Sequence, residues 1–420
     1  MSFLRRVGWL NVLLVFVPVA LFIPHGEGYA AWVFVASAVA IIPLAGLMGK
    51  ATENLSVRFG PGVSGLLNAS FGNAAELIIA LFALRKGLVE VVKASITGSI
   101  LGNVLLVLGA SLLAGGLKYP RQTFNSTAAG VAATMLALAA TGLVVPAVFH
   151  AYLPGHQFVQ AEHDLSLEIS VVLFAAYLLM LVFSLKTHRH LYDPSLNGHD
   201  SASHAPASSP ASSTSPLPVD PVPSAEAESD EEHWSVRTSL IVLVAATVGV
   251  SVMSERLVGA IEAASAVFGW TPVFVGVIVV AIVGNAAEHS TAILVAMKNH
   301  MELAVQIAIG SGIQIALFVA PLLVFVSCLP GFTRLNLVFT MLEVAAVVVS
   351  VILIALVVRD GESNWIEGLM LLAVYLIFAI AFYNLPPMEE LGHPPAPETS
   401  MGSPAFFHPV KPPSIEMTLV

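Results

Sequence analysis

Charged residues and cysteine are both scarce in this sequence. Asp, Glu, Lys and Arg make up 10% of the 420 residues, whereas soluble globular domains carry about 25%. So little charge cannot cover a water-facing surface, and much of the chain must therefore face lipid. Cys328 is the single cysteine, which excludes a disulfide framework and a thiolate metal site. Basic and aromatic residues are too sparse for a nucleic-acid surface, so no nucleic-acid partner is expected.

Long apolar segments dominate instead. Hydrophobic residues make up 57% of the chain, and the mean hydropathy is +0.86. A transmembrane helix needs about 20 mainly apolar residues, and the Gly, Ser and Ala in these segments favour packed helices over buried strands. We therefore predict an all-α integral membrane protein with eleven transmembrane helices, at residues 8–24, 30–50, 63–84, 94–117, 124–149, 165–186, 236–262, 272–297, 303–328, 335–358 and 364–385.

The first of these segments has a second interpretation. Arg5 and Arg6 precede an apolar run, and the small residues around Gly28–Ala30 follow it, which is the pattern of a cleavable signal peptide. The run from Trp9 to Ile23 is long for a signal core, and another helix follows almost at once. A transmembrane helix is therefore the favoured interpretation.

A polar segment divides the chain into six helices and five. Residues 187–235 are rich in Pro, Ser and Ala and end in a cluster of acids between Glu226 and Glu232. Such a segment cannot bury enough apolar area to offset its ordering entropy, so a disordered linker is expected. Its acids and histidines are interpreted as solvated, with Ca²⁺ sensing as the alternative.

The two sides of the linker repeat each other. The segment Phe71–Leu77 (FGNAAEL) returns 212 residues later as Val283–His289 (VGNAAEH), and the pair Gly98 and Ser99 returns at the same offset as Gly310 and Ser311. The repeating unit is five helices, with the first helix extra. The predicted organisation is an N-terminal helix (1–29), a first repeat (30–186), the acidic linker (187–235), a second repeat (236–388) and a C-terminal tail (389–420).

Five is an odd number, and that determines the topology. Consecutive copies of an odd-numbered unit enter the membrane from opposite sides, which gives two inverted repeats with a site near the midplane. Lys and Arg in the loops orient the chain. Eleven of the 17 basic residues lie inside if the N-terminus and linker are cytoplasmic and the C-terminus is outside. The short N-terminus and the lack of targeting signals favour a bacterial cell (inner) membrane.

Each repeat carries one glutamate in a strongly apolar segment. Glu76 and Glu288 occupy matched positions, and ionisable groups at membrane depth usually face a cavity or a partner. Asn73 and Asn285 lie three residues earlier, on the same predicted helix face. The alternative is a pair of protonated glutamates that hydrogen-bond between helices. The preceding glycines, Gly72 and Gly284, allow close approach or a kink.

The helix after each motif adds polar side chains. These are Ser95, Ser99 and Asn103, spaced four apart in the first copy, and Gln306, Ser311 and Gln314 in the second. Alone they are interhelical hydrogen-bonding groups, but beside two glutamates they are interpreted as an ion path. Carboxylate, amide and hydroxyl oxygens suit a hard cation such as Ca²⁺.

Three further ionisable residues have open roles. His289 follows Glu288 but lies about 100° round the helix from it, so a structural hydrogen bond and a proton relay are both retained. Glu53 and Glu255 each follow Ser or Thr near a predicted helix end. Helix capping or solvation at the membrane interface is the simpler interpretation, and a station for incoming cations or outgoing protons is the functional one.

The doubled motif, GNAAEL and GNAAEH, resembles the cation/proton exchangers of the calcium/cation antiporter superfamily. The resemblance covers the second to the eleventh predicted helix. It implies that Glu76 and Glu288 hold Ca²⁺ and protons in turn, that Asn73 and Asn285 are ligands or positioning groups, and that Ser99 and Ser311 line the path. The amides on the helix after the second motif favour protons over sodium as the counter-ion.

Charge balance then predicts the mechanism. Two bare carboxylates in a low-dielectric environment repel each other. One Ca²⁺ or two protons neutralise their charges, whereas an empty site leaves the charges uncompensated. Obligatory Ca²⁺/H⁺ exchange results if only the Ca²⁺-bound or doubly protonated protein switches between inward-facing and outward-facing forms. A cation channel, a Na⁺-coupled exchanger and an exchanger of another divalent cation are the alternatives. No resident cofactor is expected, and an enzyme is disfavoured because HExxH and paired serine and histidine motifs are missing.

Overall fold

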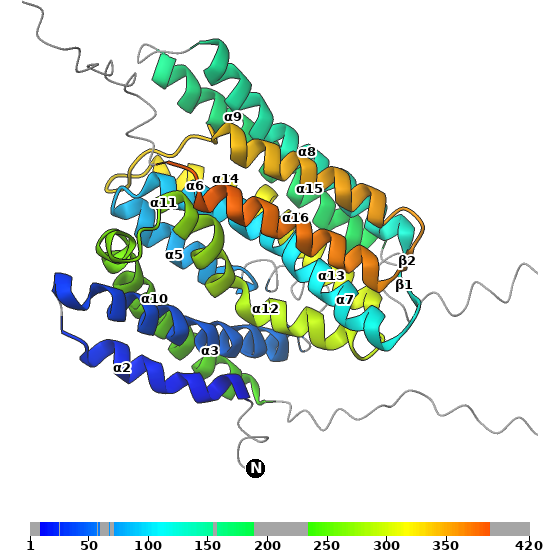
Figure 1. Cartoon of the computed structure of the whole chain (residues 1–420), viewed down its shortest axis with the longest axis horizontal. Coiled ribbons are helices and arrows are strands. Elements are labelled where there is room, and N and C mark those ends of the chain that lie inside the picture. Colours follow the sequence, from blue (N-terminus) through cyan, green and yellow to red (C-terminus); the bar gives the residue numbers. More distant parts are fainter. Residues whose placement is uncertain are drawn as a thin grey trace, which may run out of the picture. The chain divides into compact units, whose positions relative to one another are not determined.

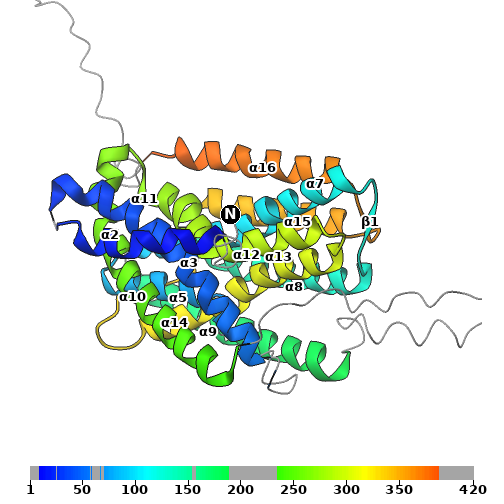
Figure 2. The ribbon, with the colours of Figure 1, turned by 90° about the horizontal axis from the view of Figure 1, so that it is seen from below.

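The structure of the protein is a computed structural model. It describes residues 9–24, 26–56, 58, 67, 71–153, 158–188 and 234–386. The predicted tail (389–420), nearly all of the predicted linker and most of 57–70 lie outside the described residues. Figures 1 and 2 show the helices in two views.

Within that part of the chain, eight helices are long and apolar enough to cross a membrane, and the protein is a multi-pass integral membrane protein. In chain order the elements are η1 (Trp9–Val15), α2 (Phe16–Phe22), η2 (Glu27–Tyr29), α3 (Ala30–Ser56), α5 (Ala74–Arg85), α6 (Val89–Leu101), η3 (Gly102–Val107), α7 (Leu108–Lys118), β1 (Gln122–Thr123), α8 (Ser126–Tyr152), α9 (Val159–Val182) and η5 (Phe183–Thr187). The second side of the linker contributes α10 (Val236–Phe268), α11 (Pro272–Phe274), η8 (Val275–Val280), α12 (Ala281–Ala296), α13 (Met301–Gln314), η9 (Ile315–Val319), α14 (Ala320–Ser327), α15 (Met341–Val357), β2 (Glu362–Ser363) and α16 (Trp365–Tyr383).

Several helix ends differ from those predicted by hydropathy. α6 begins at Val89 rather than at 94, and α10 continues to Phe268 rather than ending at 262. α15 begins at Met341 rather than at 335 because a capping box fixes its start. The Thr340 side chain accepts from the backbone N–H of Glu343, and the Glu343 carboxylate accepts from the N–H of Thr340. The apolar residues 335–339 therefore precede the helix, which hydropathy alone does not reveal.

Four π-helical segments interrupt the described helices: η3, η5, η8 and η9. π-Helical turns are rare and often mark functional sites. η3 and η9 begin 213 residues apart, close to the 212-residue offset of the motifs. η8 leads directly into the helix that carries the second motif. Three of the four segments therefore flank the repeated motifs.

Glycines let the central helices approach closely. A Cβ built on Gly98 of α6 would lie 2.0 Å from the carbonyl oxygen of Val277 in η8, and one on Gly276 would lie 2.5 Å from the Cβ of Ala94. α6 and η8 thus touch backbone to backbone, which is the small-residue packing of membrane helices. On one side of this pair, α3 and α10 lie side by side with α2 against them (Figure 1).

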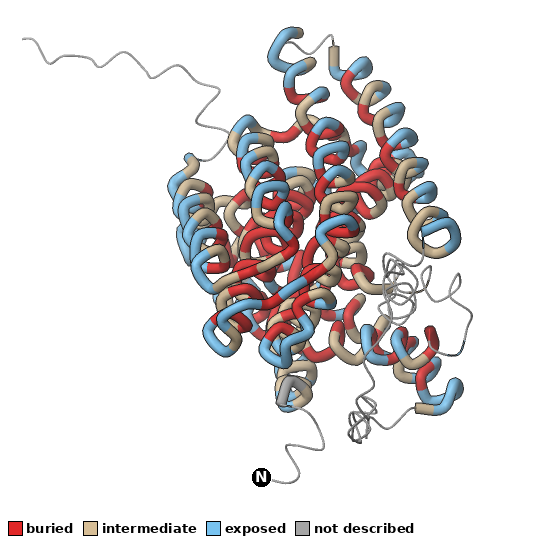
Figure 3. The backbone as a smooth tube through the Cα atoms, turned by 90° about the vertical axis from the view of Figure 1, so that its right-hand side faces the viewer, coloured by how far each residue is buried: buried red, intermediate tan, exposed pale blue. Residues whose placement is uncertain are grey.

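The peripheral helices present apolar surfaces outward. Trp32, Leu179, Val244, Leu356 and Ile377 are each more than half exposed and belong to α3, α9, α10, α15 and α16. Figure 3 shows buried residues concentrated inside the bundle and exposed ones on the outer faces of its helices. Large exposed apolar side chains on long helices fit contact with lipid rather than water.

Candidate ion-binding site

The first motif lies at the beginning of a helix. Asn73 is the N-cap of α5, and Gly72 and Asn73 form the turn before it. The prediction that Asn73 and Glu76 both lie within one helix is therefore wrong, because the regular helix starts only at Ala74. Glu76 is in its first turn and is 8% exposed. The Asn73 side chain makes no capping hydrogen bond and is directed to α13 instead.

The second motif lies inside a continuous helix. Asn285 and Glu288 are both in α12, as predicted, with Asn285 1% exposed and Glu288 half-buried. One amide N–H of Asn285 donates to the carbonyl of Ala281 in the preceding turn (2.9 Å). The two copies of the motif therefore have the same sequence pattern but different backbone conformations, since the first begins a helix and the second lies within one.

A chain of buried hydrogen bonds connects the two motifs. Asn285 donates to the Ser99 hydroxyl (3.0 Å), and Asn103 donates to the Asn285 carbonyl oxygen (3.3 Å) and to the Ser311 hydroxyl (3.0 Å). Ser311 in turn donates to the side-chain oxygen of Asn73 (3.1 Å). All five residues are at most 4% exposed, so burial makes each of these bonds costly to break. We call Asn73, Ser99, Asn103, Asn285 and Ser311 the polar cluster.

The two glutamates lie beside the polar cluster and close to each other. They are near enough for their charges to repel, and each has one buried carboxylate oxygen without a hydrogen-bond partner among the described residues. Gly284 lies directly against Glu76, since a Cβ at that position would be 2.9 Å from Cγ of the glutamate. Two acids with unused oxygens in a buried site call for a cation or for protons.

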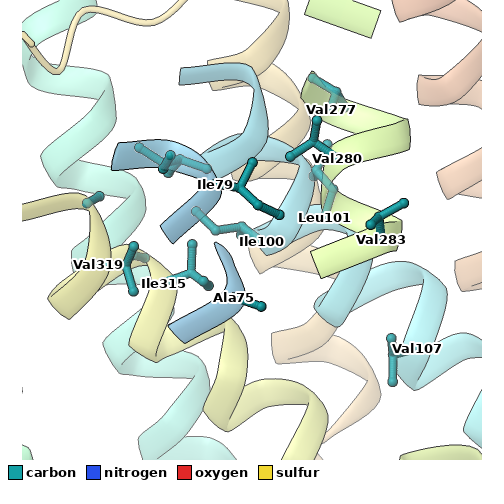
Figure 4. Packing of buried hydrophobic residues seen from close by; sticks show 14 of the residues in the cluster. Ala75, Ile79, Ile100, Leu101, Val107, Val277, Val280, Val283, Ile315 and Val319 are labelled. Carbon is teal, nitrogen blue, oxygen red and sulfur yellow. The ribbon is translucent and has the colours of Figure 1, made fainter. Parts of the chain in front are cut away.

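Apolar residues close off the surroundings of the site. Figure 4 shows Ala75 and Ile79 of α5 among branched side chains of α6, η8, α12 and η9. Ile79, Ile100 and Ile315 are each 1% exposed. Such a low-dielectric wall strengthens electrostatic interactions within the site.

Of the other residues predicted to line the ion path, only some contact the polar cluster. Gln314 accepts a hydrogen bond from Asn73 and so touches the polar cluster. Gln306 donates to Glu302 (2.8 Å), and Ser95 donates to the backbone of its own helix at Val92 (2.8 Å). Ser95 is therefore not brought to the polar cluster, although its spacing from Ser99 predicted a shared face.

His289 faces a different neighbour from the glutamates. Its Cε1 lies 4.0 Å from a Cβ built on Gly102, and its buried Nε2 has no hydrogen-bond partner among the described residues. Glu53 and Glu255 are both exposed. The capping interpretation of Glu255 is wrong, because α10 continues for thirteen residues beyond it to Phe268. Neither glutamate contacts the polar cluster through a hydrogen bond described in the structure.

A second group of polar residues connects α6 with the start of α15 and was not predicted from the sequence. Lys93 of α6 donates to the side chain of Asn336 and to the carbonyl of Val338, and Thr97 donates to Glu343 (3.2 Å). Glu343 is 3% exposed. The Thr340–Glu343 capping pattern is the sequence feature that could have located Glu343. Nothing in the sequence pairs Lys93 with position 336.

The donor set of the site is made of oxygen. Among the described residues, no group of three or more His, Cys, Asp or Glu could hold a metal ion. A cation at this site would therefore be bound by the two carboxylates together with amide and hydroxyl oxygens. Ca²⁺ accepts six to eight such oxygens in flexible geometry, whereas Zn²⁺ prefers nitrogen and sulfur.

The chain is similar to known ion exchangers over most of its length. The family model described as "Sodium/calcium exchanger protein" matches residues 29–186 and 238–384. A "Ca(2+)/H(+) antiporter ChaA" from Bacillus subtilis is 45% identical over 85% of this chain and 93% of its own. A "Ca(2+)/H(+) antiporter" from Synechocystis sp. is 43% identical over 89% of this chain and 97% of its own. The solved structure of the Ca²⁺/H⁺ antiporter protein YfkE is 39% identical, with a TM-score of 0.71, and covers 91% of this chain and 100% of that one.

Proposed function

The chain belongs to the sodium/calcium exchanger protein family, and from this premise we propose that it exchanges Ca²⁺ for H⁺ across a membrane. The relatives named as Ca²⁺/H⁺ antiporters match it over nearly their whole length, which supports the same exchange here. The observation that carries the proposal is the meeting of Glu76 and Glu288. They come from helices more than 200 residues apart, and Glu76 lies against Gly284 of the second motif and within electrostatic range of Glu288.

In this proposal, Glu76 and Glu288 form one binding site that Ca²⁺ and protons occupy in turn. One Ca²⁺ neutralises both carboxylates, and two protons do the same, whereas the empty site leaves two repelling charges in a low-dielectric environment. Asn73, Asn285, Ser99 and Ser311 supply further oxygens or hold the glutamates in place. Neither ion is a resident cofactor, because both are cargo.

Alternating access is the transport mechanism that fits one site built from two repeated motifs. We infer eleven transmembrane helices, with one extra at the N-terminus and two inverted five-helix repeats at 30–186 and 236–388. The 212-residue offset of the motifs and the near-equivalent positions of η3 and η9 support this organisation. If only the neutralised site can switch between inward and outward access, exchange becomes obligatory.

The expected location is a bacterial cell (inner) membrane, with the N-terminus and the linker in the cytoplasm. The distribution of Lys and Arg supports this orientation, and the relatives from Bacillus and Synechocystis support a bacterial setting. A proton gradient would then drive Ca²⁺ out of the cell.

The alternatives are less well supported. A channel usually builds a ring of identical groups from several subunits, whereas here the two motifs of one chain meet. Sodium coupling is disfavoured by the relatives named as Ca²⁺/H⁺ antiporters. The family is one of transporters rather than enzymes. Other divalent cations compete for the same oxygen ligands.

The experiment is uptake of ⁴⁵Ca²⁺ into everted membrane vesicles that contain the protein. Uptake should appear when the vesicle interior is acidic and should collapse when a protonophore removes the pH gradient. Uptake that is unaffected by the protonophore would contradict proton coupling. Vesicles without the protein provide the background.

A further inference from the structure

One face of α13 remains accessible although most of the helix is buried. Glu302, Gln306, Gly310 and Gln314 are each half-buried and follow one another at four-residue intervals, so they share a helix face. Their neighbours Ala304, Val305, Ala308, Ile309, Ser311 and Ile313 are at most 4% exposed. An accessible row of mainly polar residues therefore runs from the first turn of α13 to the polar cluster.

This row lines a cavity of about 190 Å³ between α13, α8 and α9. A water molecule occupies about 30 Å³ in the liquid, so the cavity has room for about six waters. Its other walls include Ala128 and Ala132 of α8 and Tyr177 of α9. Apart from the adjoining residues and backbone of α13 itself, no described atom lies within 4 Å of a Cβ built on Gly310, so the middle of the row faces open space.

Polar side chains make the cavity suitable for water. Glu302, Gln306 and Gln314 line it together with apolar residues, among them Tyr177 of α9, which is 2% exposed. A cavity of this size with several polar groups in its wall can hold ordered water.

The two ends of the row have different chemistry. At the inner end, Gln314 accepts a hydrogen bond from Asn73 of the polar cluster. At the outer end, one carboxylate oxygen of Glu302 accepts from Gln306 (2.8 Å) and the other accepts from the backbone N–H of Asn125. Each carboxylate oxygen can accept more than one such bond, so Glu302 is held in place and still has lone pairs for a cation.

We propose that this cavity is the route by which Ca²⁺ reaches Glu76 and Glu288 from the side of the membrane that carries Lys298, and that Glu302 is the first carboxylate to bind it. The inference rests on the proposed Ca²⁺/H⁺ exchange. A carboxylate at the outer end raises the local Ca²⁺ concentration by electrostatic attraction. The amides of Gln306 and Gln314 then replace water ligands along the row.

The first test is the Glu302→Gln variant, assayed by ⁴⁵Ca²⁺ flux with Ca²⁺ supplied from the Lys298 side. The half-saturating Ca²⁺ concentration should rise by about fivefold, the scale of one lost charge contact, while the maximal rate stays within about twofold. Glu90→Gln is the matched control. Glu90 precedes Glu302 by 212 residues, lies exposed in the first turn of α6 and does not line the cavity, so its loss should leave the half-saturating concentration unchanged.

The second test fills the middle of the route. Gly310→Leu should lower the maximal rate by about tenfold or more, because the side chain would occupy the open space beside the row. Gly130→Leu in α8 is the control, since no described atom lies within 4 Å of a Cβ there and Gly130 does not line the cavity. A Gly310→Cys variant, in a Cys328→Ala background, should react with a positively charged methanethiosulfonate, and Ca²⁺ should slow the reaction.

The outcomes separate this proposal from the proposed function. If the wild-type protein does not exchange Ca²⁺ for H⁺, the proposed function fails. If it exchanges normally while Glu302→Gln and Gly310→Leu both match the wild type, the cavity is not the route. A folded and active Gly310→Cys protein that reacts only with membrane-soluble reagents would show that the cavity opens to lipid, which also overturns the proposal.

Discussion

Gly284 of the second motif lies against Glu76 of the first. A Cβ at position 284 would be 2.9 Å from Cγ and 3.3 Å from Cδ of the glutamate, closer than such carbons normally approach. The glycine of one repeat therefore leaves the space that the carboxylate of the other repeat occupies. This contact gives a physical reason why a glycine precedes the asparagine in the second motif.

The substitution Gly284→Ala should displace Glu76 and lower Ca²⁺ transport strongly, by about tenfold or more, since a shift of about 1 Å in a positioned group has effects of that size. The measurement is the initial rate of pH-gradient-driven ⁴⁵Ca²⁺ uptake. Gly49→Ala in α3 is the control, because no described atom lies within 4 Å of a Cβ at that position. Equal transport by the two variants would show that the close contact is unimportant.

Replacing either glutamate by glutamine should abolish pH-gradient-driven Ca²⁺ flux. Glutamine keeps the volume and hydrogen-bonding ability of Glu76 or Glu288 but loses the charge that the cation requires. Both variants should remain folded, which gel filtration in detergent would establish. Near-normal transport by Glu76→Gln or by Glu288→Gln would remove that residue from the ion-binding site.

The polar cluster should depend most on Asn103, which donates to both Asn285 and Ser311. In Asn103→Leu, the two acceptors lose a donor in a buried position, which costs about 1–3 kcal/mol. The thermal midpoint in detergent should fall, and the half-saturating Ca²⁺ concentration should rise. Ser170→Ala is the control, because the Ser170 hydroxyl donates to the backbone of its own helix at Ser166. A similar midpoint for both variants would argue against the bridging role.

Nearly all of the linker lies outside the described residues, and its role stays a prediction. Deletion of residues 195–225 should leave transport intact, because a polar, Pro- and Ser-rich segment acts as a tether. Removing Glu226 to Glu232 as well should change at most the Ca²⁺ dependence of the rate. Complete loss of transport in the shorter deletion would show that the segment contains an ordered element.

Much of the membrane architecture and the central pair of residues could be predicted from the sequence. Apolar length predicted helices such as α8 and α16 to within a few residues, and the repeated motif predicted that Glu76 and Glu288 belong together. Both signals are local patterns that appear directly in the residue order. The family, too, was predicted from the doubled motif, and the comparisons confirm it.

What the sequence could not predict depends on packing between distant helices. The repeat implied that Gly98 and Gly310 are equivalent, yet Gly98 is pressed against Val277 while Gly310 faces a cavity. Ser95 shares the spacing of Ser99 but bonds to its own backbone. The partner of Lys93, some 240 residues away at Asn336, has no local signal at all. Helical periodicity gives the face of a side chain, but not what meets that face.

The central claim is that Ca²⁺ and protons share Glu76 and Glu288. The most direct measurement is a proteoliposome assay with a pH-sensitive dye inside and a Ca²⁺-sensitive dye outside, and with the membrane potential clamped by valinomycin and K⁺. A proton gradient should drive Ca²⁺ uphill, and a Ca²⁺ gradient should drive protons the other way. Raising the proton concentration on the Ca²⁺-loading side should increase the half-saturating Ca²⁺ concentration without lowering the maximal rate. Ca²⁺ movement down its own gradient with no counterflow of protons would contradict the account.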